Sequence, residues 1–149
     1  MKLLLAALLF TNFSHALYKD RDLIANMCWK DSKDKSHCLK DTDGYTRVLL
    51  YSASWCGPCK NEHAELVKRT LKKDVIYYSI LCDVPKVNLD SWDRAYGLSK
   101  LGIRVVAAPY DCARDFEGHG PIPAVSVITP ERRLKAFAIN PGVDWILRH

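Results

Sequence analysis

Two cysteines near the middle of the chain have the residue type and the spacing for chemistry. Cys56 and Cys59 flank Gly57 and Pro58 within the segment YSASWCGPCKNEH, which spans residues 51–63. A pair with this spacing can form a reversible redox disulfide, supply two ligands to zinc, or act as a permanent crosslink. Each of these functions needs different residues in the rest of the chain.

The zinc and crosslink interpretations find little support among the other residues. A zinc site needs two more ligands at close spacing, whereas Cys28 and Cys38 have the wrong spacing and His63 is isolated. Haem attachment needs a histidine after the second cysteine, where this chain has Lys60. A crosslink over two intervening residues closes too small a loop to stabilise the chain much. The pair is therefore predicted to be a redox-active disulfide, and we expect no metal or other cofactor.

A buried strand and a helix are predicted to position the pair. Residues 47–53 (RVLLYSA) contain an unbroken apolar run, which is typical of a strand that is buried on both faces. A helical pattern follows the pair to about residue 72. Its apolar stripe, at spacings of three, four and seven residues, comprises Cys59, Leu66, Val67 and Leu71.

This placement gives the two cysteines different chemical functions. Cys56 would lie at the N-terminus of the helix, where unpaired backbone N–H groups and the helix dipole stabilise an anion. Because the thiolate is the attacking species in thiol–disulfide exchange, Cys56 is predicted to be the nucleophile. Cys59 lies one turn later on the inward stripe and is predicted to resolve the mixed disulfide by attacking Cys56.

The remaining pattern predicts one α/β domain. Residues 17–45 are polar apart from an apolar patch at 23–29, for which we expect a short helix followed by a loop. Further predicted strands span 74–84, 102–108, 123–129 and 133–139, and predicted helices begin near Asn88 or Asp90, lie around 112–116 and span 143–148. Alternating strands and helices followed by a hairpin predict a mixed central sheet with helices on both faces.

These motifs resemble the thioredoxin family. WCGPCK after a buried strand is similar to the thioredoxin active-site motif, and Gly120–Ala124 (GPIPA) is similar to the loop that faces the disulfide in that fold. The resemblance covers about residues 46–140 and implies a cis peptide bond between Ile122 and Pro123. The Ile122 backbone would pair with a substrate strand. Trp55 is expected to pack beside the disulfide, and the expected substrate-binding residues are Trp55, Gly57, Pro58, Ile122 and Pro123.

Two features are similar to the exported TlpA/ResA-type branch of the family. Cys59 and Pro123 are 64 residues apart, and the extra length at about 84–108 resembles the helix-and-strand insert of that branch. Thioredoxins carry a buried Asp where this chain has Leu50, whereas the TlpA-type branch carries a Glu at the position of Glu62. The resemblance implies a reductant of proteins in the bacterial cell envelope, including apocytochromes c in cytochrome c maturation.

Glu62 is a third candidate catalytic residue. It lies on the inward stripe, three residues after Cys59 and four before Leu66. A desolvated carboxylate there would have a raised pKa and could move protons for Cys59. The alternative is a boundary residue whose carboxylate reaches solvent, and only the direction of the side chain decides between the two.

The first residues are typical of a secretory signal. Lys2 precedes the apolar run 3–10, and Ser14 and Ala16 place small residues before a cleavage site after Ala16. We therefore expect an exported protein, periplasmic by the resemblance, with a secreted protein or an endomembrane lumen as alternatives. The expected divisions are a signal peptide at 1–16, an N-terminal extension at 17–45 and a thioredoxin-like domain at 46–149. The extension shows no sign of the paired N-terminal strands that many TlpA-type proteins have.

Four further cysteines fit an exported chain, in which disulfides persist. Cys28 and Cys38, in a polar segment, are predicted to form a structural disulfide. Cys82 and Cys112 could form a second structural disulfide or a redox couple that relays electrons to the central pair. The structural interpretation is favoured because neither cysteine belongs to a CxxC motif.

The charge and the histidines of the sequence indicate little about its function. The net charge of +5 comes from basic residues among acidic ones, and no aromatic-basic stripe indicates nucleic acid. His63 and His119 are interpreted as surface polar residues, with His119 the better candidate for tuning the site. The expected partners are protein thiols and disulfides, and the chain is expected to be a monomer.

The sequence leaves open whether the cysteine pair donates or accepts electrons, and three functions are compatible with it. The Gly-Pro pair between the cysteines and Ile122 before the cis-proline match thioredoxin and favour a reductase. An oxidising compartment favours an oxidase or isomerase, because a reductase there needs a membrane electron donor. A non-catalytic binding module that senses redox state is the third interpretation.

Overall fold

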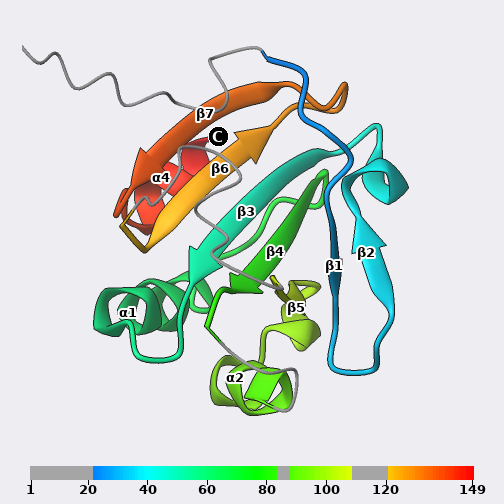
Figure 1. Cartoon of the computed structure of the whole chain (residues 1–149). Coiled ribbons are helices and arrows are strands. Elements are labelled where there is room, and N and C mark those ends of the chain that lie inside the picture. The colour runs from blue at the N-terminus through cyan, green and yellow to red at the C-terminus, as the bar shows by residue number, and fades with distance from the viewer. Residues whose placement is uncertain (1–21, 84–87, 109–120) are drawn as a thin grey trace, which may run out of the picture.

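A computed structural model describes residues 22–83, 88–108 and 121–149 (Figure 1). In this part of the chain seven strands form one sheet in the order β2-β1-β5-β4-β3-β6-β7. The strands are β1 (Cys28–Lys30), β2 (Ser36–Cys38), β3 (Thr46–Ser52), β4 (Val75–Leu81), β5 (Arg104–Ala107), β6 (Ala124–Ile128) and β7 (Leu134–Ile139). The helices are η1 (Leu39–Thr42), α1 (Gly57–Leu66), α2 (Leu89–Tyr96), η3 (Ser99–Leu101) and α4 (Val143–Arg148). The predicted mixed α/β sheet is confirmed.

Strand β3 is an interior strand of the sheet, between β4 and β6, and leads into helix α1. It pairs in parallel with β4 and antiparallel with β6, while β4 pairs in parallel with β5. Residues 47–52 are all buried, as expected for a strand that is covered on both faces. The parallel pairing brings the carboxyl ends of β3 and β4 to the same edge of the sheet, close to α1 (Figure 1).

The three α-helices of the described residues cover the same face of the sheet. Leu66 of α1, Trp92 of α2 and Ile146 of α4 belong to one apolar cluster with Val48 and Leu50 of β3. The sequence predicted helices on both faces. On the second face the structure shows η1 and an extended N-terminal segment, since that face is covered by the apolar side chains of Ile24, Trp29 and Leu39.

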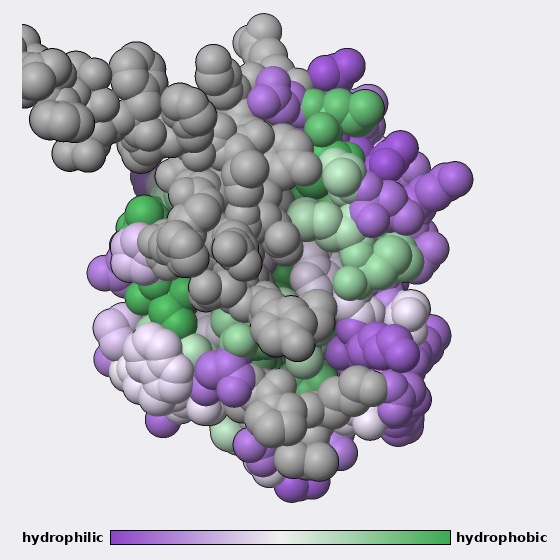
Figure 2. Space-filling model, in the orientation of Figure 1, coloured by the Kyte–Doolittle hydropathy of each residue, from purple (hydrophilic) through white to green (hydrophobic). Residues whose placement is uncertain are grey.

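The helix expected at residues 23–29 is wrong, because this segment leads into a β-hairpin. Strands β1 and β2 pair antiparallel, and β1 also pairs with β5, so the hairpin belongs to the sheet. Asp31 fixes the turn, since its carboxylate accepts hydrogen bonds from the backbone N–H groups of Lys33 and Lys35 at 2.9 and 3.0 Å. Hydrophilic residues gather on this side of the molecule (Figure 2, right). Paired N-terminal strands are therefore present, although the sequence pattern did not reveal them.

Most other predicted elements agree with the structure to within a few residues. Helix α1 is an exception, because it ends at Leu66 rather than near residue 72. The helix predicted around 112–116 and the signal peptide predicted at 1–16 lie outside the described residues. No helix in the described ranges is long and apolar enough to span a membrane.

Candidate redox site

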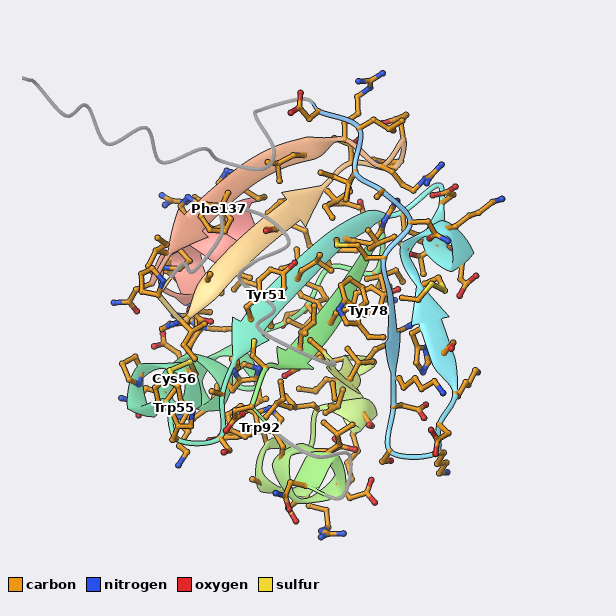
Figure 3. All side chains as sticks on the ribbon, viewed as in Figure 1. Tyr51, Trp55, Cys56, Tyr78, Trp92 and Phe137 are labelled. Carbon is orange, nitrogen blue, oxygen red and sulfur yellow. A yellow bond between two sulfur atoms is a disulfide. The ribbon has the colours of Figure 1, made fainter. Side chains whose placement is uncertain are left out.

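The Cys56–Cys59 disulfide lies where strand β3 leads into helix α1 (Figure 3). Cys56 is the N-cap residue of α1, and its N–H donates a hydrogen bond to the Ala53 carbonyl at 3.0 Å. Pro58 suits the first turn of a helix, where its missing N–H would have no partner within the helix. Cys56 is 3% exposed and Cys59 is fully buried, so the first cysteine is the one nearer to solvent.

Helix α1 directs positive potential at Cys56. The Cys59 N–H donates a hydrogen bond to the Cys56 sulfur at 3.2 Å. In the reduced protein, this N–H and the helix dipole would stabilise a thiolate on Cys56. The arrangement suits Cys56 as the nucleophile and Cys59 as the resolving residue, and these roles remain predictions.

The turn before Cys56 is anchored by a carboxylate from the neighbouring strand. Ser54 donates to Asp83 through its backbone N–H, at 2.9 Å, and through its hydroxyl. Asp83 follows the end of β4, where the Cys82 N–H donates to the Ser52 carbonyl at 2.9 Å. Sequence reasoning missed Ser54 and Asp83. A polar residue after each of two neighbouring parallel strands is the signal that could have indicated them, because such ends meet at one edge.

The residues expected to bind substrate lie close to the disulfide. The Ile122–Pro123 peptide bond is cis, and Ile122 packs against Ala53 and both cysteines. Pro123 is buried. In contrast, Gly57 and Pro58 are exposed, and Trp55 is 71% exposed, beside Cys56 in Figure 3. The indole of Trp55 therefore offers an apolar surface to a partner instead of being covered by the protein.

Glu62 has the buried position that the sequence left open. Its side chain is 7% exposed, and its two carboxylate oxygens have no hydrogen-bond partner among the described residues. Burial raises the pKa of Glu62 from its ordinary value of 4.5 to about 7. A carboxyl group with this pKa exchanges protons readily near neutral pH, three residues after Cys59 on the same helix.

His63 is buried, so its interpretation as a surface residue is wrong. Its Nδ1 lies 2.9 Å from the Cys59 carbonyl oxygen, and its Nε2 lies 2.8 Å from the Ser79 hydroxyl on β4. Burial lowers the pKa of His63 to about 4, although the hydrogen bond to Cys59 acts in the opposite direction. Sequence reasoning missed His63 and Ser79 as neighbours of the site. The only available signal was the four-residue spacing from Cys59 to His63, which places both on one helix face.

The other cysteines lie at two different places. A disulfide joins Cys28 and Cys38 across the β1–β2 hairpin, which is separated from β3 by β5 and β4. Cys82 is also disulfide-bonded, and its expected partner, Cys112, lies outside the described residues, as does His119. Within residues 22–83, 88–108 and 121–149, no three His, Cys, Asp or Glu side chains are grouped to hold a metal ion.

Comparison with known proteins identifies the fold. No protein-family model matches the sequence, and a search of the curated proteins finds no match. Among solved structures, a DsbF homologue from Corynebacterium diphtheriae superposes with a TM-score of 0.70 at 17% identity, over 93% of this chain and 92% of that chain. The chain has the thioredoxin fold.

Two further structures share this thioredoxin fold. A protein from Bacteroides thetaiotaomicron, assigned provisionally as a disulfide isomerase, has a TM-score of 0.73 at 16% identity. The superposition covers 90% of this chain and 93% of that chain. A secreted disulfide oxidoreductase from Mycobacterium tuberculosis, homologous to E. coli DsbE, has a TM-score of 0.64 at 14% identity, over 83% and 92% of the two chains. Thiol–disulfide chemistry thus recurs among the proteins that share the fold.

Proposed function

We propose that this chain is an exported thiol:disulfide oxidoreductase that acts on protein disulfides through Cys56 and Cys59. The observation that carries the proposal is the position of the disulfide. It lies at the N-terminus of α1, and the cis Ile122–Pro123 bond is beside it. The helix N-terminus supports exchange because it stabilises the thiolate, and by the family resemblance the Ile122 backbone would pair with an extended substrate segment.

The reductive reaction proceeds in two displacements. The Cys56 thiolate attacks one sulfur of a substrate disulfide, forms a mixed disulfide and releases the other substrate sulfur as a thiolate. Cys59 then loses its proton and attacks the Cys56 sulfur, which breaks the mixed disulfide and releases the second substrate thiolate. The Cys56–Cys59 dithiol thereby loses two electrons and becomes the disulfide, and the substrate thiolates take up two protons.

Glu62 serves as the proton acceptor for Cys59 in this proposal. The Cys59 thiol is fully buried and cannot give its proton directly to solvent. Glu62 lies one helical turn from it, and burial places the pKa of the carboxyl near neutrality, at about 7. A group with this pKa can accept the thiol proton when Cys59 attacks and release it afterwards.

The reductase direction is proposed together with membership of the TlpA/ResA-type branch. The CGPC sequence and Ile122 resemble thioredoxin, whereas Glu62 and the α2–β5 segment resemble the TlpA-type branch. The β1–β2 hairpin adds support, because many TlpA-type proteins have paired N-terminal strands. The resemblance makes envelope proteins such as apocytochromes c the proposed substrates.

The same proposal assigns a compartment and an electron donor. Residues 1–16 would direct export to the periplasm, and residues 17–45 and 46–149 would remain as extension and domain. A reductase in an oxidising compartment needs a membrane electron donor to return Cys56 and Cys59 to the dithiol. The chain would act as a monomer on protein thiols and disulfides.

Substrate trapping tests the proposal. Cys59→Ser should hold Cys56 in mixed disulfides with several proteins of the cell envelope, since the resolving thiol is absent. Cys56→Ser should trap none and is the matched control. Recovery of a single protein would favour a dedicated binding module, and recovery of none by Cys59→Ser would overturn the enzymatic proposal.

A further inference from the structure

A chain of buried hydrogen bonds connects helix α2 with the helix that carries the cysteines. The Trp92 indole Nε1–H donates to the Ser79 hydroxyl oxygen at 3.1 Å. Ser79 lies 2.8 Å from His63 Nε2, and His63 Nδ1 lies 2.9 Å from the Cys59 carbonyl oxygen. Ser79 and His63 are fully buried and Trp92 is 6% exposed. Trp92 lies between α2 and the sheet (Figure 3).

The partners of the imidazole determine which nitrogen carries the proton. A carbonyl oxygen only accepts, so Nδ1 must carry the hydrogen that is donated to Cys59. Burial lowers the pKa of His63 to about 4, so the ring is neutral near pH 7 and its Nε2 must be an acceptor. Ser79 therefore donates its hydroxyl hydrogen to Nε2 and accepts from Trp92.

Aromatic neighbours from α2 hold the imidazole in this orientation. The His63 and Trp92 rings meet edge to face, with centroids 5.2 Å apart and planes inclined at 72°. Tyr96 lies on the same side, with its centroid 5.8 Å from that of His63. The ring of His63 is thus fixed by packing as well as by its two hydrogen bonds.

The chain continues through the backbone to the nucleophilic cysteine. The Cys59 carbonyl belongs to the same peptide group as the Lys60 N–H, which donates to the Cys56 carbonyl at 3.1 Å. From Trp92 to Cys56, each hydrogen points toward the cysteines, so the bond dipoles add to the dipole of α1. Hydrogen bonds in such a series strengthen one another, by about 10–30% per bond in condensed phases.

We propose that Trp92, Ser79 and His63 are positioning residues that increase the reactivity of Cys56 by extending the hydrogen-bonded dipoles of α1 into helix α2. The proposal rests on the thiol–disulfide function proposed for Cys56. It assigns a chemical role to α2, which otherwise only covers the sheet. In this role none of Trp92, Ser79 and His63 contacts the substrate, because each acts through the next residue of the hydrogen-bonded series.

The hydroxyl of Ser79 is the link that can be removed with the least change in packing. Ser79→Ala leaves His63 Nε2 without a donor and the Trp92 N–H without an acceptor. Ser126→Ala is the matched control, because Ser126 is equally buried in the same sheet and its hydroxyl has no partner among the described residues. Trp92→Phe removes the indole N–H that begins the hydrogen-bonded series and keeps an aromatic ring.

The test measures how fast iodoacetamide alkylates Cys56 in the Cys59→Ser background at about pH 7. We expect Ser79→Ala and Trp92→Phe each to slow alkylation about two- to fivefold. Ser126→Ala should leave the rate within the error of the measurement. The double variant Ser79→Ala with Trp92→Phe should be no slower than Ser79→Ala alone, because one break already interrupts the chain.

A second measurement separates this proposal from the proposed function. In the protein that retains both Cys56 and Cys59, Ser79→Ala should shift the equilibrium with glutathione toward the disulfide. The shift in the equilibrium constant should match the factor by which alkylation slows, since the Cys56 thiolate is less stable. Equal behaviour of Ser79→Ala and Ser126→Ala in both assays would overturn the proposal. These readouts need no protein substrate, so an altered Ser79→Ala together with failed trapping by Cys59→Ser would reject only the function.

Discussion

Replacing Glu62 with Gln should change the way in which the stability of the oxidised protein depends on pH. Burial raises the pKa of Glu62 from 4.5 to about 7, so the folded protein binds more protons there than the unfolded chain between these values. The free energy of unfolding therefore falls as pH rises through this range. At 1.36 kcal/mol per pKa unit, the loss amounts to about 3 kcal/mol once the pH exceeds the folded pKa.

His63 contributes the opposite slope. Burial lowers its pKa from 6.5 to about 4, so the unfolded chain binds more protons at His63 between these values. The resulting gain in the free energy of unfolding with rising pH is also about 3 kcal/mol. In the wild type the two contributions oppose each other between about pH 4.5 and 6.5, and the loss from Glu62 remains above that range.

Of these two contributions, Glu62→Gln keeps only that of His63. The stability of this variant should rise to about pH 6.5 and then stay constant. It should equal the wild type near pH 4 and exceed it by about 3 kcal/mol near pH 8, because Gln resembles the protonated carboxyl. The difference is large enough to resolve in urea unfolding, where extrapolated free energies carry errors of about 10–15%.

The assay is urea unfolding of the oxidised protein at a series of pH values from about 4 to 8. Glu65→Gln is the matched control, since Glu65 is exposed on the same helix and pairs with Arg69 at 2.9 Å. That surface pair should contribute at most about 1 kcal/mol, so Glu65→Gln should change the free energy of unfolding by no more than this. A Glu62→Gln variant that is less stable than the wild type near pH 8 would refute the reasoning, because it would mean an ionised and paired carboxylate.

Three further predictions concern residues at different distances from the site. Replacing both Cys28 and Cys38 with Ser should lower the free energy of unfolding by about 2–3 kcal/mol, in the chain-entropy model, without changing the alkylation rate of Cys56. Arg47→Met should lower it by about 3 kcal/mol or more in urea unfolding, because the fully buried guanidinium donates to the carbonyls of Thr42, Tyr45 and Pro130. Trp55→Ala should change stability by less than about 0.5 kcal/mol but slow the reduction of insulin disulfides, since the indole is 71% exposed beside Cys56. Unchanged insulin reduction by Trp55→Ala would contradict a substrate-binding role.

The sheet could be predicted from the sequence because its central strands have a local signal. Residues 47–53 contain an apolar run, and residues 74–84 are rich in β-branched and aromatic residues. Strand β3 is displaced by one residue from the predicted bounds, and β4 lies within them. The Pro130-Glu131 turn likewise indicated the hairpin of β6 and β7. Each of these elements is specified by neighbours in the sequence, so one sequence was sufficient.

The N-terminal hairpin could not be predicted in the same way. Strands β1 and β2 are three residues each, too short for a period of two to be recognised. They are held by the carboxylate of Asp31, by the Cys28–Cys38 disulfide and by pairing with β5, which lies far along the chain. The hydrogen bonds of Asp31 are local and the disulfide was predicted, but no local pattern encodes the pairing with β5.

Around the cysteines, too, the sequence predicted what depends on local pattern and missed what depends on residues far along the chain. The positions of Cys56 and Cys59 at the beginning of a helix followed from local pattern. The burial of His63 did not, because its partners Ser79 and Trp92 come from β4 and α2. A histidine on a helix reads as polar until the strand and the second helix that satisfy its nitrogens are known.

The reduction potential of the Cys56–Cys59 pair tests the central claim most directly. The purified protein would be equilibrated in thiol redox buffers, and the state of each cysteine would be read by alkylation and mass spectrometry. We predict reduction of this pair near the thioredoxin value of about −270 mV, while Cys28–Cys38 stays oxidised. A value of about −120 to −180 mV would keep the exchange chemistry but reverse the proposed direction. A pair that stays oxidised below about −300 mV, as structural disulfides do, would contradict the claim that Cys56–Cys59 is a redox centre.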